Sequence, residues 1–133
     1  MDDSYNDYEP TRAGRAISEF VNEHLSNWYV RLSRRRFWKG EYTPEKISAY
    51  QTLYKCLEVI AQLISPIAPF FAERLFVDLN SVTQRYAVDS VHLTNFPEAD
   101  VSMIDKALEE RMELAQKISS MVLSIRKKIN IRV

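Results

Sequence analysis

Aromatic rings and positive charges are concentrated in one stretch of the sequence, residues 25–39 (LSNWYVRLSRRRFWK). It holds two tryptophans, a tyrosine, a phenylalanine and five Lys or Arg residues, and it contains no Asp or Glu. Guanidinium groups hold phosphates through paired hydrogen bonds, and exposed aromatic rings stack on unpaired bases. This stretch is therefore the strongest candidate in the sequence for contact with RNA or DNA.

A helical projection divides this part of the sequence into two neighbouring stripes. At about 100° per residue, one narrow stripe predicts a core seam. Its members are Val21, Leu25, Trp28 and Leu32. The other stripe predicts a polar, basic edge, and its members are Asn27, Arg31, Arg34 and Trp38. A purely structural interpretation stays open, in which the arginines complement the helix dipole and Trp28 and Tyr29 belong to the core.

The composition bounds the class of protein. A chain of 133 residues, 46% hydrophobic and 27% charged, suits one globular domain with a single core. The 18 Lys and Arg balance the 18 Asp and Glu, so net charge alone indicates no polyanionic partner. Cys56 is the only cysteine, which excludes a disulfide framework. This cysteine usage fits a reducing, cytoplasmic setting. The acidic amino terminus predicts no signal peptide, and the lack of a long apolar run predicts no membrane span.

Hydrophobic periodicity predicts two long helices in the first half of the chain. The first covers residues 12–36, with Thr11 as its N-cap and Gly40 just past its end, where a left-handed residue is favoured. The second begins at Thr43, which caps a helix with Pro in its first position. Pro66 lacks a backbone N–H and must end or kink this helix.

The second half of the chain predicts two more helices separated by a connector. A helix restarts at Pro69 and ends near residues 80–81. Residues 91–97 alternate and end in Pro, which indicates an extended connector lying over the helices. Ser102 resembles the start of a capping box for a last helix over residues 104–129. One apolar face per helix predicts an all-α fold, an antiparallel bundle of about four long helices with a short extended connector.

Residue types suited to catalysis are scattered. His24 and His92 are far apart, and neither has a Cys or His at ligand spacing, so no metal site is predicted. Cys56 has no neighbouring His and is interpreted as a structural thiol. The sequence has no glycine-rich phosphate loop. We therefore predict no catalytic residue, no metal and no cofactor within these residues.

Four segments carry a family resemblance. They are residues 25–38 (LSNWYVRLSRRRFW), 64–73 (ISPIAPFFAE), 90–97 (SVHLTNFP) and 126–133 (RKKINIRV). Together they resemble the anticodon-binding domain of the isoleucyl-tRNA synthetases, which are class Ia aminoacyl-tRNA synthetases. The Pro-Phe turn within residues 64–73 is shared with the valine, leucine and methionine enzymes. The last two segments point to isoleucine.

The resemblance implies a helical domain that holds the anticodon arm of tRNA-Ile. The parent enzyme would use ATP to attach isoleucine to that tRNA, and zinc is a further candidate cofactor of the parent. The family's H-I-G-H and K-M-S-K-S motifs and its inserted editing domain are absent. Residues 1–133 are thus interpreted as a single domain truncated at both ends, with the acidic residues 2–8 as a frayed end. The missing catalytic domain would be a second partner.

The resemblance and the basic stretch together predict the residues that face RNA. The first set is Asn27, Arg31, Arg34, Arg35, Trp38 and Lys39. A second, weaker patch is Arg126, Lys127, Lys128 and Arg132. The competing hypothesis is a helical protein-interaction module that docks through Trp28, Phe37 and Trp38. A DNA-reading helix-turn-helix fits poorly, because the helices are long and no short Gly-containing turn separates two of them at the required spacing.

Overall fold

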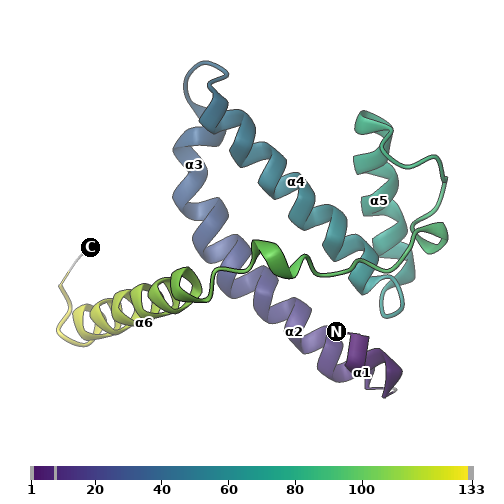
Figure 1. Ribbon diagram of the computed structural model, residues 1–133. Coiled ribbons are helices and arrows are strands. Elements are labelled where there is room, and N and C mark those ends of the chain that lie inside the picture. The colour runs from purple at the N-terminus through teal and green to yellow at the C-terminus, as the bar shows by residue number, and fades with distance from the viewer. Residues whose placement is uncertain (1, 8, 132–133) are drawn as a thin grey trace. The chain divides into compact units, whose positions relative to one another are not determined.

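The structure is a computed structural model and describes residues 2–7 and 9–131. Every regular element in that part of the chain is a helix (Figure 1). The all-α class predicted from the sequence is confirmed. The chain divides into two compact units, Met1–Pro97 (unit 1) and Glu98–Val133 (unit 2).

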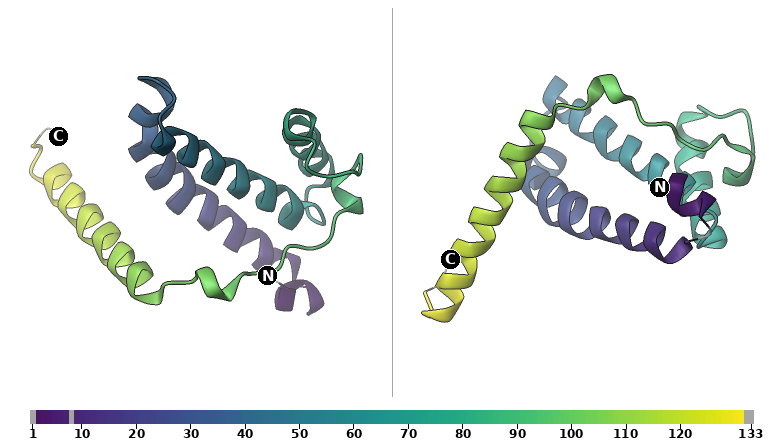
Figure 2. Two further views of the ribbon diagram at one scale, coloured as in Figure 1. Left: turned by 45° about the horizontal axis from the view of Figure 1, so that its top comes forward. Right: turned by 60° about the horizontal axis from the view of Figure 1, so that its bottom comes forward.

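Unit 1 is built on a helical hairpin. Its elements are α1 (Asp2–Asn6), α2 (Pro10–Glu19), η1 (Phe20–Val30), α3 (Arg31–Trp38), α4 (Pro44–Ile64), α5 (Pro69–Thr83) and η2 (Val91–Leu93). Three of these, α2, the π-helical η1 and α3, follow one another without a break and form one long helix. Figure 2 shows this long helix and α4 side by side, joined by a short turn. The predicted ends of α4 at Thr43 and before Pro66 are confirmed.

The π-helical segment changes which residues of the long helix face inward. The inward positions recur at every fourth residue and are Ala13, Ile17, Val21, Leu25, Tyr29, Ser33 and Phe37. Leu32, which the sequence placed in the core seam, is 69% exposed, so that prediction is wrong. Trp28 is half-buried. The prediction assumed α-helical rotation throughout, whereas a π-turn closes its hydrogen bond over five residues and rotates less per residue.

The interior between the long helix and α4 is apolar. At its edge, tyrosine hydroxyl groups form hydrogen bonds with backbone carbonyl groups. Ile17, Leu25 and Ile60 form a buried cluster. Tyr29 Oη donates to the carbonyl oxygen of Ala49 at 2.9 Å. Each such bond satisfies a polar group at the edge of the apolar contact.

A second apolar cluster ties α5 to α4. Ala61, Ala72, Phe76 and Val91 are each no more than 2% exposed. Val91 belongs to a short 3-10 turn within the segment predicted to be extended, so the connector is not extended throughout. It does lie over the helices at Val91, as predicted, although Leu93 is 68% exposed.

The amino-terminal residues differ from their prediction. The segment interpreted as frayed contains the helix α1, and Tyr5 Oη donates to the carbonyl oxygen of Leu63 at 2.6 Å. The Tyr5 ring also meets Phe96 edge-on, with 5.9 Å between centroids. Thr11 is not an N-cap, because α2 already begins at Pro10, whose missing N–H costs nothing in the first turn.

The turn between the two helices of the hairpin follows its prediction. Thr43 Oγ1 accepts the backbone N–H of Lys46 at 3.3 Å and caps α4. Gly40 has a φ of +84°, a left-handed conformation that glycine adopts without a steric penalty.

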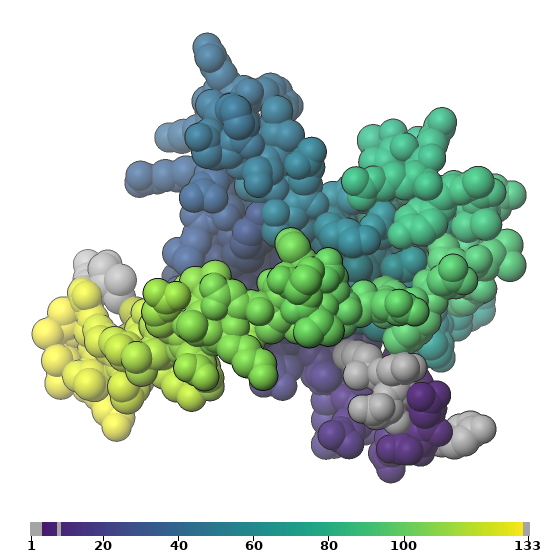
Figure 3. Space-filling view, in the orientation of Figure 1, coloured from purple at the N-terminus to yellow at the C-terminus, as the bar shows by residue number. Residues whose placement is uncertain are grey.

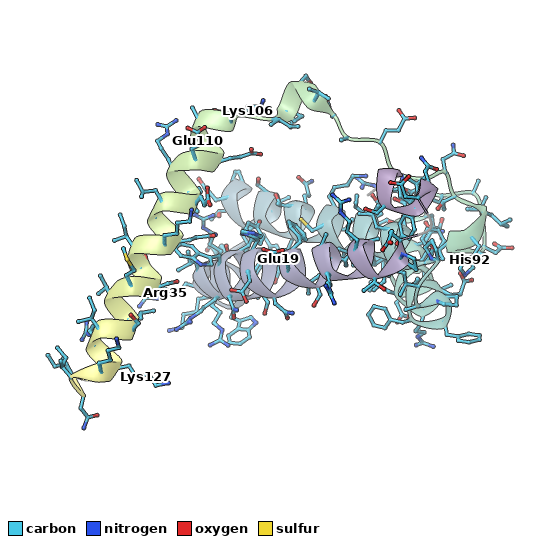
Figure 4. All side chains as sticks on the ribbon, turned by 90° about the horizontal axis from the view of Figure 1, so that it is seen from below. Glu19, Arg35, His92, Lys106, Glu110 and Lys127 are labelled. Atoms are coloured by element: carbon cyan, nitrogen blue, oxygen red, sulfur yellow. The ribbon has the colours of Figure 1, made fainter. Side chains whose placement is uncertain are left out.

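Unit 2 contains the 3-10 turn η3 (Val101–Met103) and the helix α6 (Lys106–Lys128). The predicted N-cap Ser102 is wrong. Asp105 Oδ1 accepts the N–H of Leu108 at 3.0 Å and caps α6, because a carboxylate suits the positive end of the helix dipole. Side chains stand on all sides of α6, with Glu110 near its start and Lys127 near its end (Figure 4). None of the helices in the described part of the chain has both the length and the apolar character that a membrane crossing requires.

Candidate nucleic-acid interface

The first set of predicted RNA-facing residues lies on the second half of the long helix and at its end. All of its members are exposed, namely Asn27, Arg31, Arg34, Arg35, Trp38 and Lys39. The turn that follows α3 forms one extremity of unit 1, and side chains protrude there (Figure 3). The structure therefore leaves this set accessible to a large partner.

Two buried residues fix the orientation of α3. Ser33 and Phe37 are 6% and 8% exposed, and Phe37 packs against α4. The Phe37 ring lies 5.0 Å from that of Tyr50, and Tyr50 Oη donates to the Phe37 carbonyl oxygen at 2.9 Å. Since successive α-helical residues are about 100° apart, Arg31 and Arg35 lie on the side of α3 away from α4. The core contact of Phe37 thus determines where the cations point.

Arg34 and Trp38 form a preassembled pair on one flank of α3. The guanidinium carbon of Arg34 lies over the Trp38 ring, 5.5 Å from its centroid. The two residues are one helical turn apart, so the helix itself brings them together. Trp38 is 77% exposed, and an exposed cation–π contact is worth about 0.5–1 kcal/mol. The pair offers a planar apolar surface beside a positive charge, which matches a base and its phosphate.

The structure adds candidates that the sequence prediction omitted. Tyr42, in the turn after α3, is 78% exposed. Lys46 Nζ lies 4.8 Å from the Tyr42 ring centroid and donates to the Gly40 carbonyl oxygen at 3.3 Å. Arg36 is also exposed and was left out, although it lies inside the basic stretch. The sequence signal that could have identified Tyr42 is its position two residues after the turn glycine Gly40, where an aromatic side chain is expected to be exposed.

Two acidic residues, Glu41 and Glu45, lie beside this surface. The pKa of Glu45 is lowered, first by its own backbone hydrogen bond at the start of α4, then by the Thr43 hydroxyl, and also by the charge of Arg36. The carboxylate therefore stays ionised in mildly acidic solution. It reduces the positive potential close to Arg36.

The second predicted patch belongs to unit 2. Lys127 and Lys128 are exposed in the last turn of α6, and Arg126 is half-buried. Basic residues there complement the negative end of the helix dipole. The fourth predicted member, Arg132, lies outside the described residues.

The docking patch predicted by the competing hypothesis does not form as expected. Phe37 is buried against Tyr50, which excludes it from a surface patch. Trp28 is half-buried, and of the three only Trp38 is exposed. The aromatic residues of this stretch are thus divided between the core and the surface.

Titratable groups elsewhere are used in packing. Burial raises the pKa of the Cys56 thiol, so it carries little thiolate at neutral pH. The buried carboxylate of Glu58 pairs with Lys55 at 2.7 Å and with Arg85 at 3.8 Å. Among the described residues, no group of three or more His, Cys, Asp or Glu side chains lies together in a way that could hold a metal ion.

A hollow of about 450 Å³ is lined by residues of α4 and α5 and by Arg85. Its lining is mostly apolar and comprises Tyr50, Gln51, Leu53, Tyr54, Leu57, Leu79, Thr83 and Arg85. The Arg85 guanidinium lies over the Tyr54 ring at 5.4 Å. The lining offers no nucleophile beside a general base, so it supports no hydrolytic or transfer chemistry.

Comparison with known families gives a match over the whole chain. Residues 1–133 match the family described as the anticodon-binding domain of tRNA ligase. The match includes both units and the basic stretch on α3.

Curated relatives agree with this match. The chain is 59% identical over 133 residues to isoleucine–tRNA ligase of Bacteroides thetaiotaomicron. It is 61% identical over 131 residues to that of Cytophaga hutchinsonii, and 48% identical over 133 residues to that of Dehalococcoides mccartyi. These alignments cover 98–100% of the chain but only 11–13% of each relative. The chain thus corresponds to a small part of the relatives it matches.

Proposed function

The chain belongs to the anticodon-binding domain family of tRNA ligases, and from this premise we propose that it holds the anticodon arm of tRNA-Ile within an isoleucine–tRNA ligase. The ligase would join isoleucine to its tRNA at the expense of ATP in the cytoplasm. This part of it contributes recognition, and its catalytic and ATP-binding residues would lie elsewhere. Zinc in the parent enzyme stays a prediction that no residue described here supports.

The exposed Arg34–Trp38 pair carries the proposal. It lies in a stretch with five cations and no acid, on the surface of α3 that its core contacts leave free. An anticodon loop presents unpaired bases and a turn of closely spaced phosphates, and protein modules bind such loops by stacking and by positive charge. Trp38 would stack on a base, and Arg31, Arg34, Arg35 and Lys39 would contact phosphates.

Titration with RNA tests the proposal directly. The chain is titrated with tRNA-Ile and with an unrelated tRNA at two salt concentrations. We expect tighter binding of tRNA-Ile and a loss of affinity as salt rises, because phosphate contacts release counterions. Trp38→Ala removes one stacking surface worth about 1–3 kcal/mol, a loss of roughly 5- to 150-fold in affinity.

A charge-matched control separates the site from net charge. Arg34→Glu should weaken binding and reduce the salt dependence, while Arg15→Glu makes the same charge change on α2 and should leave affinity nearly unchanged. Equal effects of both variants would mean that RNA responds only to net charge. Equal affinity for the two tRNAs at both salt concentrations would exclude specific recognition.

One observation favours a second candidate function for the same surface. Leu32 is 69% exposed on the flank of α3 opposite Trp38, and an apolar side chain there suits protein contact. The partner would be the catalytic domain of the same ligase. Under that alternative, Leu32→Ser and Trp38→Ala would impair charging by the full ligase while leaving tRNA affinity unchanged.

A further inference from the structure

The inward residues of the long helix have a spacing that an α-helix cannot maintain. They recur at every fourth residue from Ala13 to Phe37. Ile17, Val21, Leu25, Tyr29 and Phe37 pack with residues of α4. A step of four α-helical residues overshoots a full turn by about 40°, and from Ala13 to Phe37 the overshoot would reach about 240°. If the whole segment were α-helical, the last of these residues would therefore point away from α4.

The π-helical segment η1 lies between Ala13 and Phe37, the first and last of these inward residues. Its turns are wider, so each residue rotates the chain by less. Within η1, Val21, Leu25 and Tyr29 keep the spacing of four and still face the same neighbours. The segment thus removes about 200° or more of rotation, which corresponds to roughly two α-helical residues.

The consequence falls on the basic surface. In a continuous α-helix, the seam through Trp28 and Leu32 would continue to Arg35 and Arg36 and direct their charges at α4. Burying an unpaired guanidinium is costly. With η1 in place, Ser33 and Phe37 take the inward positions, and the Arg34–Trp38 pair lies in solvent.

We propose that η1 is a phase-setting segment, which absorbs two extra residues and thereby fixes the rotational orientation of α3 that exposes Arg34 and Trp38. The residues of η1 that do this are positioning residues, since they act through the orientation of α3. The part of the proposal that concerns tRNA rests on the proposed function, whereas the part that concerns orientation does not.

A double deletion tests whether rotational phase is what η1 provides. Glu23 and Ser26 are exposed and lie outside the candidate RNA-binding set. Removing both leaves the inward residues at spacings of four and three, which a plain α-helix holds within an arc of about 120°. Phe37 would still face α4. We expect this variant to fold, to show the same far-UV helicity, and to bind tRNA-Ile within about threefold of the undeleted chain.

A triple deletion that also removes Asn22 breaks the phase. One further residue lost rotates α3 by about 100°, so that Trp38 takes the direction of Phe37 and Arg34 that of Ser33. Widened turns rotate the helix further in the same sense and cannot repair this. We expect at least a tenfold loss of tRNA affinity, comparable with the loss of the stacking pair.

A readout without RNA follows the orientation itself. In a Trp28→Phe background, Trp38 is the only tryptophan, and iodide quenching of its fluorescence reports its exposure. Quenching should be unchanged in the double deletion and should fall in the triple deletion. If the triple deletion does not fold, the double deletion decides alone.

Opposite results would overturn the proposal. A double deletion that unfolds, or that loses quenching of Trp38, would show that removing two residues does not preserve the rotational orientation of α3. So would a triple deletion that keeps both tRNA binding and quenching. An undeleted chain that binds no tRNA, with quenching that still follows the deletions, would reject the proposed function and leave the role of η1 in orienting α3 supported.

Discussion

Two regions of unit 1 use polar side chains in opposite ways. In the α5 region, which comprises α5 and residues 84–93, polar groups bind the backbone. The Glu73 carboxylate accepts the Ser90 hydroxyl at 2.9 Å and the Val91 N–H at 3.0 Å. Asn80 accepts the N–H of Tyr86 and donates to its carbonyl oxygen, both at 3.0 Å. The segment after α5 is irregular, and these side chains supply the hydrogen bonds that its backbone would otherwise find in a helix or strand.

In the α3 region, which comprises α3 and the turn at residues 39–43, the charged side chains are exposed instead. Arg31, Arg35 and Lys39 stand in solvent, and the core contact below them is made by Phe37. Exposed charges contribute little to stability because water screens them. The contrast teaches that the α5 region uses these polar groups for folding, whereas the α3 region keeps its cationic side chains available for a partner.

The largest expected effect is the loss of the α5 core. Phe76 is 2% exposed and its ring lies 5.4 Å from that of Tyr86. Phe76→Ala should cost about 3–5 kcal/mol of unfolding free energy, because it leaves a cavity that its neighbours fill only in part. Urea denaturation followed by circular dichroism measures this.

Phe70→Ala is the matched control on the same helix. Phe70 is 90% exposed, so its removal should change the unfolding free energy by no more than about 0.5 kcal/mol. Trp38→Ala in the α3 region should be equally mild. A stability loss at Trp38 as large as that at Phe76 would remove the distinction between the two regions.

Glu73→Ala should produce the next largest effect. It deprives the Ser90 hydroxyl and the Val91 N–H of their acceptor, and Val91 is 2% exposed. An unsatisfied buried donor costs about 1–3 kcal/mol. Amide hydrogen exchange at Val91 should accelerate.

Glu73→Gln keeps a carbonyl oxygen at the same place and should recover part of the loss. Binding to tRNA should be unaffected by either change. Protection of Val91 in Glu73→Ala equal to that in the native chain would mean that packing alone holds the segment.

Much of the fold follows from the sequence because its signals are local. Thr43 with Pro44, the paired breaks at Pro66 and Pro69, and the left-handed Gly40 each act through their own backbone geometry. These signals gave the ends of α4 and the start of α5. Thr11 and Ser102 failed because a neighbouring residue, Pro10 or Asp105, served the helix start instead.

The orientation of the candidate site could not be predicted in the same way. The composition of residues 25–39 identified the cations and Trp38, but a uniform rotation placed Leu32 inside, and the competing hypothesis placed Phe37 on the surface. The wider turns of η1 pack against α4 through Val21, Leu25 and Tyr29, so the rotation there depends on residues that are distant in the sequence. Tertiary packing decided the phase, and the phase decided which side chains face solvent.

Glu45→Gln has the smallest expected effect and examines the boundary of the α3 region. The lowered pKa of Glu45 means that its ionised form stabilises the fold at neutral pH, and that this contribution is lost as pH falls from its ordinary pKa through the lowered value. The substitution should lower the melting temperature by at most about 2 °C at pH 7 and by nothing in strong acid, where the native carboxyl is protonated as well. It should also raise tRNA affinity slightly at low salt, because it removes a negative charge beside Arg36.

Glu41→Gln makes the same charge change before α4 begins, so it should share the effect on affinity but not the effect on melting. A variant that lost both stability and tRNA affinity would place Glu45 among the groups that hold the turn at residues 39–43 in shape, and this charged group would then serve the fold as the polar groups of the α5 region do.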